Sequence, residues 1–348
     1  MISMVKKNGK NLVDWFHDKW RTNLQFSTAV ALVLMIVLQT LALGFDFDSP
    51  GDWFGTWIQN WINILRNNAG IGIVSLGMTF VILSGGIDLA AGSTVVAVGA
   101  FIMVLIDVGP QGILSNLGIT GWPVYIIAIL LGIMFGALLG AFNGLLITYG
   151  KLPPFIATLG TMKIYRSVTQ HFMQGYNPEV PKPFLEIASL KIGGQLLMPI
   201  IYWLLLAALL YVISVKTTFG RQVTAVGSNE KATRLSGVNV NKIKRRVYML
   251  MGVLVSVAAI VQVSRIGAMD YANAGSGYEM DAISSVIVGG TSMSGGKGTI
   301  IGTVLGALII AVMNNLLNLL GVPPFLREAF KGVIVIGAVL LQKKESNA

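Results

Sequence analysis

Cysteine is absent from the 348 residues, and histidine occurs only at His17 and His171. Disulfides, thiolate nucleophiles and cysteine-ligated metals are therefore excluded, and two histidines leave little for a metal cluster or an acid–base relay. Charge is also scarce. Only 11% of the residues are charged, against roughly 25% in an average soluble domain, so a soluble protein of this size would lack polar surface.

Long apolar segments take the place of charge, since hydrophobic residues make up 54% of the chain. A transmembrane helix needs roughly 17–25 apolar residues, and we predict an all-α integral membrane protein with about ten such helices. Two segments, 69–84 and 280–290, are short and run into glycine clusters, so we expect them to be broken or re-entrant. The ten segments are 24–44, 69–84, 90–108, 123–149, 155–174, 198–215, 247–264, 280–290, 299–320 and 325–341.

The formal net charge of +10 does not point to nucleic acid, because its distribution is that of a membrane protein. Lys and Arg gather in residues 1–23, in 216–246 and in the tail 343–348, whereas the stretch after the first segment is acidic. Cytoplasmic loops carry the excess of Lys and Arg. Ten spans with both termini in the cytoplasm place every basic cluster inside.

These features predict a single transmembrane domain over 24–342, with 216–246 as a cytoplasmic loop. The segment 1–23 carries Leu12, Trp15, Phe16 and Trp20 on one helical face, so we expect it to lie along the inner membrane surface. A frayed tail is the alternative. The first apolar segment is longer than the core of a cleaved signal, and we expect it to remain as an anchor.

An internal repeat aligns GALLGAFNGLLITYGKLPPF (136–155) with GALIIAVMNNLLNLLGVPPF (306–325), and eight of the 20 positions are identical. In a ten-span topology Pro153 is cytoplasmic and Pro323 external, which predicts an inverted five-plus-five repeat. A rival pairing of the glycine pairs at 85–86 and 289–290 rests mainly on a common residue. Coincidence among apolar runs is the remaining alternative.

No nucleotide-binding loop is found. The segment GGTSMSGGKGT (289–299) has Thr291 where a P-loop needs its first glycine, and Gly298 where it needs Ser or Thr. The chain therefore does not bind ATP through a P-loop.

Polar residues interrupt the apolar runs at a few places. The run 84–93 surrounds Asp88, and a carboxylate at membrane depth costs roughly 2.5–3.5 kcal/mol. Asp88 either lines a path for a polyol or caps the following helix. Similarly, Thr158 and Thr161 face either a solute or a neighbouring helix. The candidate pathway-lining residues are Ser84, Asp88, Ser93, Asn143, Thr158, Thr161, Ser284 and Asn314.

Two basic residues, Lys163 and Arg166, lie further along the segment 155–174. A lipid-facing position would be costly there, so either they snorkel or they pair with a carboxylate such as Asp281 or Glu328. The sequence leaves both readings open.

The basic loop contains a capped helix over 229–236, with Asn229 as its N-cap and Gly237 as its stop. A compact helix between two spans can serve as a contact through which another protein moves those spans. The alternative is that the loop only carries the positive charge that sets the topology, but this role needs no capped helix. The candidate coupling residues are Gly227, Asn229, Glu230, Ala232, Arg234, Ser236 and Gly237.

Four motifs occur in order: GGIDLAAGS (85–93), PFIATLGTM (154–162), AVGSNEKATRLSGVN (225–239) and DAISSVIVGGTSMSGGKGT (281–299). With them the chain, from about residue 60 to its end, resembles the membrane permeases of ABC importers for ribose, xylose, galactose and related solutes. Ala90 stands where serine is usual in this family, and Thr233 where alanine is usual. These departures leave the identity of the solute open.

The resemblance implies a multi-pass permease of the bacterial inner membrane that pairs with a second permease copy and is not itself an enzyme. It implies an extracytoplasmic solute-binding protein, and a separate ATPase subunit that carries ATP and magnesium and docks on the 229–237 helix. This chain would bind no cofactor and no nucleic acid. Its cargo would be a monosaccharide. A nucleoside or an autoinducer is the alternative within the same class, an ion-driven secondary transporter is the rival outside it, and an intramembrane enzyme has little support.

Overall fold

The computed structural model describes residues 24–45, 49–323, 326–333 and 336. Within these residues the chain is helical, and its only strand-like pairing is an isolated bridge between Ile192 and Gln195. The helices are α2 (Leu24–Leu43), α3 (Pro50–Leu83), α4 (Ala91–Ile106), α5 (Ile113–Asn116), α6 (Trp122–Thr148), α7 (Pro154–Met173), α8 (Lys182–Ser189), α9 (Met198–Lys216), α10 (Thr218–Ser228), α11 (Glu230–Leu235), α12 (Val240–Ile266), α13 (Tyr278–Val288) and α14 (Ile300–Leu319).

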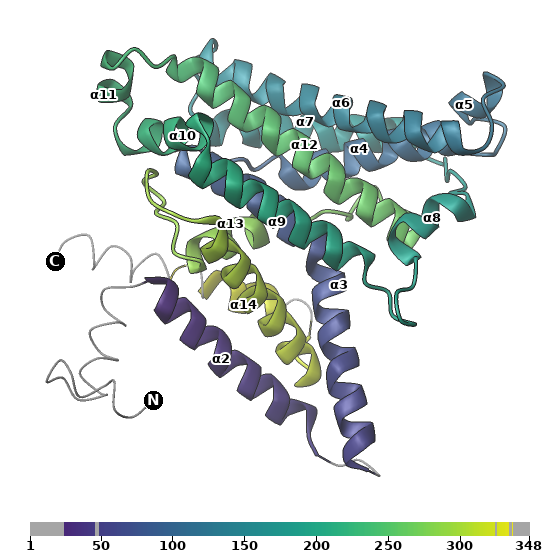
Figure 1. The fold of residues 1–348 in the computed structure, drawn as a ribbon. Coiled ribbons are helices and arrows are strands. Elements are labelled where there is room, and N and C mark those ends of the chain that lie inside the picture. The colour runs from purple at the N-terminus through teal and green to yellow at the C-terminus, as the bar shows by residue number, and fades with distance from the viewer. Residues whose placement is uncertain (1–23, 46–48, 324–325, 334–335, 337–348) are drawn as a thin grey trace, which may run out of the picture.

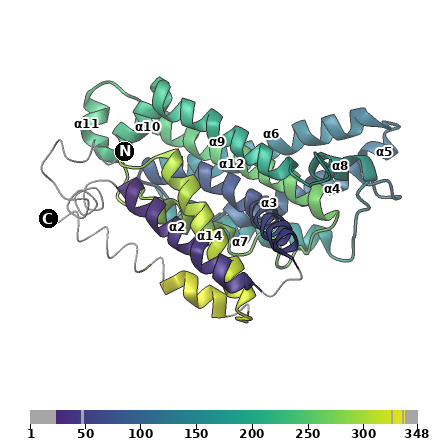
Figure 2. The same cartoon turned by 60° about the horizontal axis from the view of Figure 1, so that its bottom comes forward.

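The helices form two groups that share α3. Helices α4, α6, α7 and α12 lie side by side, and α12 packs against α6, α3 and α4 (Figure 1). Helices α2 and α14 pack on each other beside α3 and form a smaller lobe (Figure 2). Helix α11 lies at one end of the larger group, whereas α5 and α8 lie at the other. We refer to these as the α11 end and the α5 end.

Glycines set the contact between α6 and α12. A Cβ at Gly252 would clash with the carbonyl of Gly136, and one at Gly140 would clash with the carbonyl of Tyr248. In lipid, helices associate by close packing rather than by the hydrophobic effect, and small residues allow their backbones to approach. These glycines therefore hold α12 at the centre of the molecule.

Six described helices are long and apolar enough to cross a membrane: α2, α3, α6, α9, α12 and α14. Helix α4 is apolar but has 16 residues, and α13 has only 11, which is about 16 Å of helix against a hydrocarbon core of about 30 Å. Large apolar side chains on α6 and α9 point outward, among them Leu130, Leu138 and Leu205, as expected of surfaces that face lipid.

The prediction for the segment 69–84 is wrong in its start and its length. Helix α3 begins at Pro50, behind an N-cap at Ser49 whose hydroxyl accepts from the Asp52 amide, and runs for 34 residues. Its first half carries a row of amide side chains, which lowers the hydropathy without breaking the helix. The segment is therefore a long helix and not a short, broken one.

Each of the next seven predicted segments, from 90–108 to 299–320, coincides with a described helix, and 24–44 coincides with α2. The tenth segment, 325–341, is described as helix only over 326–333. The amphipathic segment 1–23 and the tail 343–348 lie outside the described residues.

Candidate functional site

Three irregular segments meet at the α11 end. The first is the break 84–90 between α3 and α4, the second is the end of α10, and the third is the loop 289–299 between α13 and α14. The amide of Gly296 donates to the carbonyl of Leu83 at 3.0 Å. Each of these segments belongs to a different sequence motif, and their convergence is not visible in the sequence.

Gly227 is the point where the three segments touch. A Cβ there would clash with the carbonyl oxygen of Leu83 and would lie 2.6 Å from the amide nitrogen of Gly296. The hydroxyl of Ser228 donates to the carbonyl of Gly296 at 3.5 Å. Only glycine fits at position 227, so a shift of α10 bears directly on the end of α3 and on the loop 289–299. We call Leu83, Gly227, Ser228 and Gly296 the junction.

Helices α10 and α11 form a bent arm that projects from the α11 end. Asn229 separates them, and its Oδ1 accepts from the Ala232 amide at 2.9 Å, as the N-cap prediction requires. The hydroxyl of Thr233 donates back to the Ala225 carbonyl of α10 at 2.8 Å. These bonds fix the angle between the two helices. Helix α10 itself was missed, although Thr217 caps it and apolar residues recur on one face.

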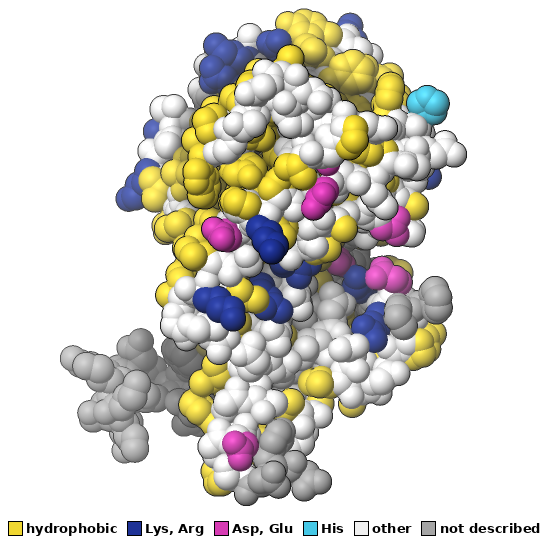
Figure 3. Space-filling model, turned by 90° about the vertical axis from the view of Figure 1, so that its right-hand side faces the viewer, with side chains coloured by type: hydrophobic (Ala, Val, Ile, Leu, Met, Phe, Trp, Pro, Cys, Tyr) yellow, Lys and Arg dark blue, Asp and Glu magenta, His cyan; other side chains and the backbone are white. Residues whose placement is uncertain are grey.

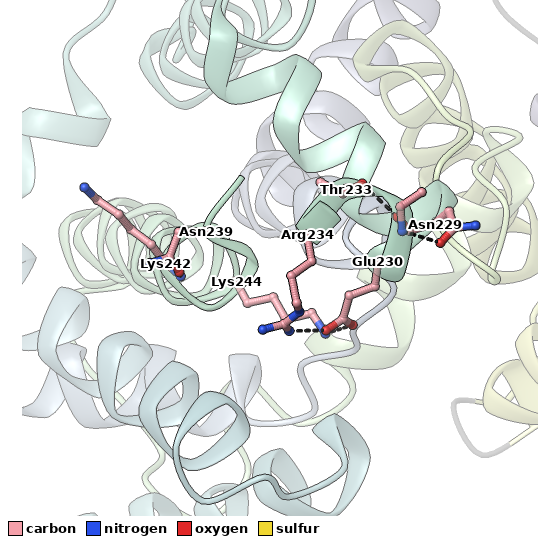
Figure 4. A network of polar contacts seen from close by, with 8 residues as sticks. Asn229, Glu230, Thr233, Arg234, Asn239, Lys242 and Lys244 are labelled. Atoms are coloured by element: carbon pink, nitrogen blue, oxygen red, sulfur yellow. Dashed lines mark hydrogen bonds and ion pairs between the residues drawn. The ribbon is translucent and has the colours of Figure 1, made fainter. Parts of the chain in front are cut away.

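Glu230 ties this arm to α12. Its carboxylate is 2.7 Å from Lys244 Nζ and 3.0 Å from Arg234 (Figure 4). The hydrogen bond from Lys244, with that from Arg234, lowers the pKa of Glu230 although partial burial opposes the shift. The carboxylate thus stays charged at neutral pH and holds α11 against the first turns of α12.

Gly237 ends α11 in the left-handed region, at φ +82°. Its amide donates to Arg234 O, and the Val238 amide donates to Thr233 O, the pairing of a helix C-cap. Ser236 bonds back to Ala232. At the tip, the Leu235 side chain is 90% exposed.

The break after α3 is held by a hydrogen bond within the break and by two neighbouring side chains. Asp88 is buried, and its Oδ1 accepts from the Ala90 amide at 2.9 Å, at the start of α4. The Ile87 carbonyl accepts from the hydroxyls of Tyr248 at 3.0 Å and Thr158 at 3.5 Å. The bond to Ala90 corresponds to the capping role, and the role of Asp88 in a pathway stays a prediction.

The structure brings together most of the candidate pathway residues and separates two of them. Ser84 and Ser93 flank Asp88 and are buried, and Asn143 receives a hydrogen bond from Tyr165, which packs against Ala90. Thr161 is buried on α7 and bonds within its own helix. Ser284 lies on α13, bonded to Met280, and Asn314 lies on α14 in a separate cavity lined by asparagines.

The proposed ion pairs of Lys163 and Arg166 are not formed. The guanidinium of Arg166 donates to the carbonyls of Ala274 at 2.6 Å and Ala272 at 3.3 Å. Asp281 and Glu328 instead bind Lys331, each at 2.9 Å. Lys163 is exposed on α7. Of the two alternatives left open by the sequence, pairing with Asp281 or Glu328 is therefore wrong, because Asp281 lies on α13, next to the helical segment 326–333.

Among the described residues, no group of three His, Cys, Asp or Glu side chains is placed to hold a metal ion. The site is instead a set of backbone contacts. The arm formed by α10 and α11 contacts the end of α3, where the break 84–90 begins, and the loop 289–299 within a bundle of apolar helices.

Comparison with known proteins is consistent with this arrangement. A family described as the permease component of branched-chain amino acid transport systems matches residues 60–339. The chain is 41% identical to the ribose import permease protein of Bacillus subtilis (strain 168) over 82% of this chain and 85% of the relative. It is 39% identical to the ribose import permease protein of Escherichia coli (strain K12), over 95% and 97%. It is 30% identical to the xylose transport system permease protein of the same organism, over 91% of both. No solved structure matches the chain.

Proposed function

This chain belongs to the family of permease components of branched-chain amino acid transport systems, and from that membership we propose that it is the membrane permease of a bacterial ABC importer for a monosaccharide. The relatives named above are ribose and xylose permeases that match nearly the whole chain. They are bacterial, and six described helices are apolar and long enough to span a membrane. The chain thus works in the inner membrane as a pathway-forming subunit and not as an enzyme.

The observation that carries the proposal is the arm formed by α10 and α11. It projects from the bundle, and at the bend between its two helices it touches two backbone breaks through Gly227. An ATP-driven importer whose membrane subunit has no nucleotide site must receive mechanical work from an ATPase subunit, and this arm supplies a place for that contact. ATP and magnesium then belong to the partner ATPase, which docks on Leu235 and its neighbours.

The inverted repeat gains support from the directions of the helices. Helix α6 ends beside the start of α12, where Arg245 lies over the Tyr149 ring at 5.0 Å, so Lys151 and Pro153 lie at the α11 end. Helix α14 starts just after the loop 289–299 at that same end and runs away from it (Figure 1). The two Pro-Pro-Phe sites thus follow helices of opposite direction, as five spans per half require. With the α11 end in the cytoplasm, both termini lie inside and ten helices cross or enter the membrane.

A second copy of this chain is expected against α7. One face of this helix exposes three polar residues at helical spacing, Lys163, Ser167 and His171, and the C-cap residue Gln174 is exposed as well, while its opposite face is buried. Charged and polar side chains are costly against lipid and usually face a watery path or a partner helix. Pairing two copies through this face removes it from lipid and leaves a polar path between them. The binding protein then delivers the solute at the α5 end.

The test is uptake into proteoliposomes that contain this chain together with the ATPase and binding protein of the same bacterium. Radiolabelled D-ribose, D-xylose, D-galactose, adenosine and L-leucine are compared. We expect saturable, ATP-dependent uptake of at least one sugar that stops when either partner is left out. Uptake that follows an ion gradient without the ATPase would overturn the proposal, and adenosine uptake alone would overturn its sugar cargo.

A further inference from the structure

Amide side chains gather between α3 and α14, far from the junction. A cavity of about 220 Å³ lies there, and six of its nine lining residues are asparagines. Seen from the α5 end, charged side chains gather in the hollow between the two lobes of the molecule (Figure 3). The cavity asparagines are Asn63, Asn67 and Asn68 on α3, and Asn314, Asn315 and Asn318 on α14.

Part of this amide group holds the two helices together. Asn60 and Asn315 exchange two hydrogen bonds at 3.3 and 3.2 Å. The Asn318 oxygen accepts from Arg327 at 2.9 Å, and the Asn67 oxygen accepts from Arg265 at 2.7 Å. Helix packing therefore explains Asn60, Asn67, Asn315 and Asn318.

Helix packing does not explain Asn314. Its side-chain oxygen is buried, and within the described part of the chain it has no hydrogen-bond partner. Burying an amide oxygen without a partner costs stability, and each such atom in a folded protein calls for an explanation. Asn63 lines both this cavity and a second one of about 390 Å³, which also contains Thr56 and Gln59. Polar groups thus continue along one face of α3.

We propose that this amide-lined cavity is a binding site for a neutral polyhydroxyl solute. Asn63, whose Oδ1 already accepts from Gln59 at 3.4 Å, offers the solute its Nδ2 donors, and the unpartnered Oδ1 of Asn314, which is buried in this conformation, accepts from the solute when the amide turns toward the cavity. The proposal rests on the function given above and assigns a place to its cargo. Each hydroxyl both donates and accepts, and an asparagine amide offers two donors and an acceptor. Such a surface matches a sugar, whose hydroxyls point in several directions.

The shape and the lining of the cavity favour a sugar over a branched-chain amino acid. Its volume lies below the roughly 300–1,000 Å³ of sites for drug-sized ligands, so the ligand is small. Its apolar lining consists of Ile64 and Ala311, too little to enclose a leucine side chain. Arg327, its only charged lining residue, already donates to Val322 and Asn318.

The position of the cavity along the membrane normal is that expected of a site which an imported solute reaches from outside. Helix α14 starts beside the junction, and Asn314 lies 14 residues further along, about 21 Å away. In the proposed topology the cavity therefore lies in the outer half of the membrane, and a solute released by the binding protein reaches it before the junction.

Thiol protection tests the site, because the natural chain has no cysteine. Asn63→Cys is reacted with an impermeant thiol reagent in the full complex, with and without millimolar D-ribose, D-xylose, D-galactose or L-leucine. We expect at least one of the sugars to slow the reaction about tenfold and leucine to have no effect. The matched control is Asn116→Cys on α5, an exposed position whose reaction should not respond to any of the four.

Asn314→Leu separates binding from packing. Removing the unpartnered oxygen should leave the Tm unchanged or raised, while the KM for sugar rises roughly 3- to 10-fold, as expected for one lost hydrogen bond. Asn60→Leu is the control, and it should lower the Tm because it breaks the pair with Asn315.

The outcomes distinguish this inference from the function on which it rests. Sugar uptake without thiol protection, together with an unchanged KM in Asn314→Leu, would overturn the cavity as a binding site and leave the sugar importer in place. A fall in Tm without a change in KM would assign Asn314 to packing and also overturn the site. Protection by sugar in a complex that does not take up sugar would support the cavity and contradict the proposed function.

Discussion

Asp88 is a single carboxylate for which the sequence allows two roles, in a pathway and as a helix cap. Its Oδ1 accepts from the Ala90 amide, a bond that an asparagine oxygen can make equally well. Its charge is therefore not required by the local backbone, although a charged group at this depth is expensive. The side chain is buried between α3 and α4, and the charge calls for a purpose other than capping.

Asp88→Asn tests that purpose. We expect the variant to keep its Tm, since the cap remains, and to lose uptake by about tenfold, which corresponds to about 1.4 kcal/mol. Transport assays and thermal unfolding of the same preparation measure both quantities. Asp88→Leu is the companion variant and should lower the Tm as well. Normal uptake by Asp88→Asn would leave Asp88 with the capping role alone.

Glu230 gives the arm a dependence on pH. The hydrogen bonds from Lys244 and Arg234 lower its pKa below the ordinary value near 4.5. The unfolded state therefore binds this proton more tightly than the folded state, and the stabilisation by Glu230 is complete above that pKa and lost as pH falls. An exposed pair of this kind contributes only about 0–1 kcal/mol.

We therefore expect Glu230→Gln to lower the Tm slightly at pH 7 and to approach the natural protein as pH falls below about 4.5. Thermal unfolding in detergent between pH 7 and pH 4 measures this convergence. A Tm difference that is the same at both ends of the range would show that the charge of Glu230 does not hold α11 to α12.

At the scale of elements, the arm shows what local sequence signals can predict. Asn229 and Gly237 delimit a helix by their own backbone chemistry, and both ends are confirmed. Helix α3 shows the opposite case. Its amide row lowers the hydropathy of residues 50–68, so a search for apolar length began the helix 19 residues too late.

The junction was beyond the reach of sequence reasoning for a different reason. The glycines at 227 and 296 lie 69 positions apart and both face Leu83, but no single-sequence pattern links them. Likewise, the Asn60–Asn315 pair joins residues 255 positions apart. Local patterns predicted the helices and their caps, whereas contacts made only by tertiary packing stayed hidden.

Gly237 tests whether the arm must keep its angle. Its φ of +82° is a left-handed conformation that costs a residue with a Cβ roughly 1–2 kcal/mol, and more when the side chain is branched. We expect Gly237→Val to leave insertion in the membrane unchanged while solute-stimulated ATP hydrolysis and uptake fall together.

The control is Gly237→Asn, because asparagine tolerates the left-handed region best among the other residues, and it should retain most of the activity. No side chain or backbone lies within 4 Å of a Cβ at this position, so a loss in the valine variant reports on conformation and not on a clash. If Gly237→Val and Glu230→Arg both transport normally, the arm is not the coupling element.

At the scale of the whole molecule, one helix joins the two candidate sites. Helix α3 ends at Leu83 in the junction and carries Asn63 in the amide cavity, and it is unbroken between them. The separation of 20 residues corresponds to about 30 Å. A displacement of Leu83 by α10 therefore moves the wall of the cavity without passing through a flexible loop.

The direction of the chain through the membrane decides whether that displacement can drive import. The amide cavity must open outward and the arm must lie in the cytoplasm, which requires the sequences at 150–155 and 320–325 to lie on opposite sides. Two positions within the repeat, Lys151 and Leu320, are both exposed. Reference positions are available at Lys231 on the arm and at Asn116 on α5.

We expect the thiols introduced by Leu320→Cys and Asn116→Cys to react with an impermeant reagent added to intact cells. Those introduced by Lys151→Cys and Lys231→Cys should react only after the membrane is opened. The comparison is internally controlled, because each variant carries one thiol in a chain that otherwise has none. Labelling of Lys231→Cys from outside would invert the topology and place the arm where no ATPase can reach it. If Leu320→Cys, like Lys151→Cys, reacts only after the membrane is opened, the inverted repeat is excluded while the arm stays in the cytoplasm, because Lys151 and the arm lie at the same end of the molecule.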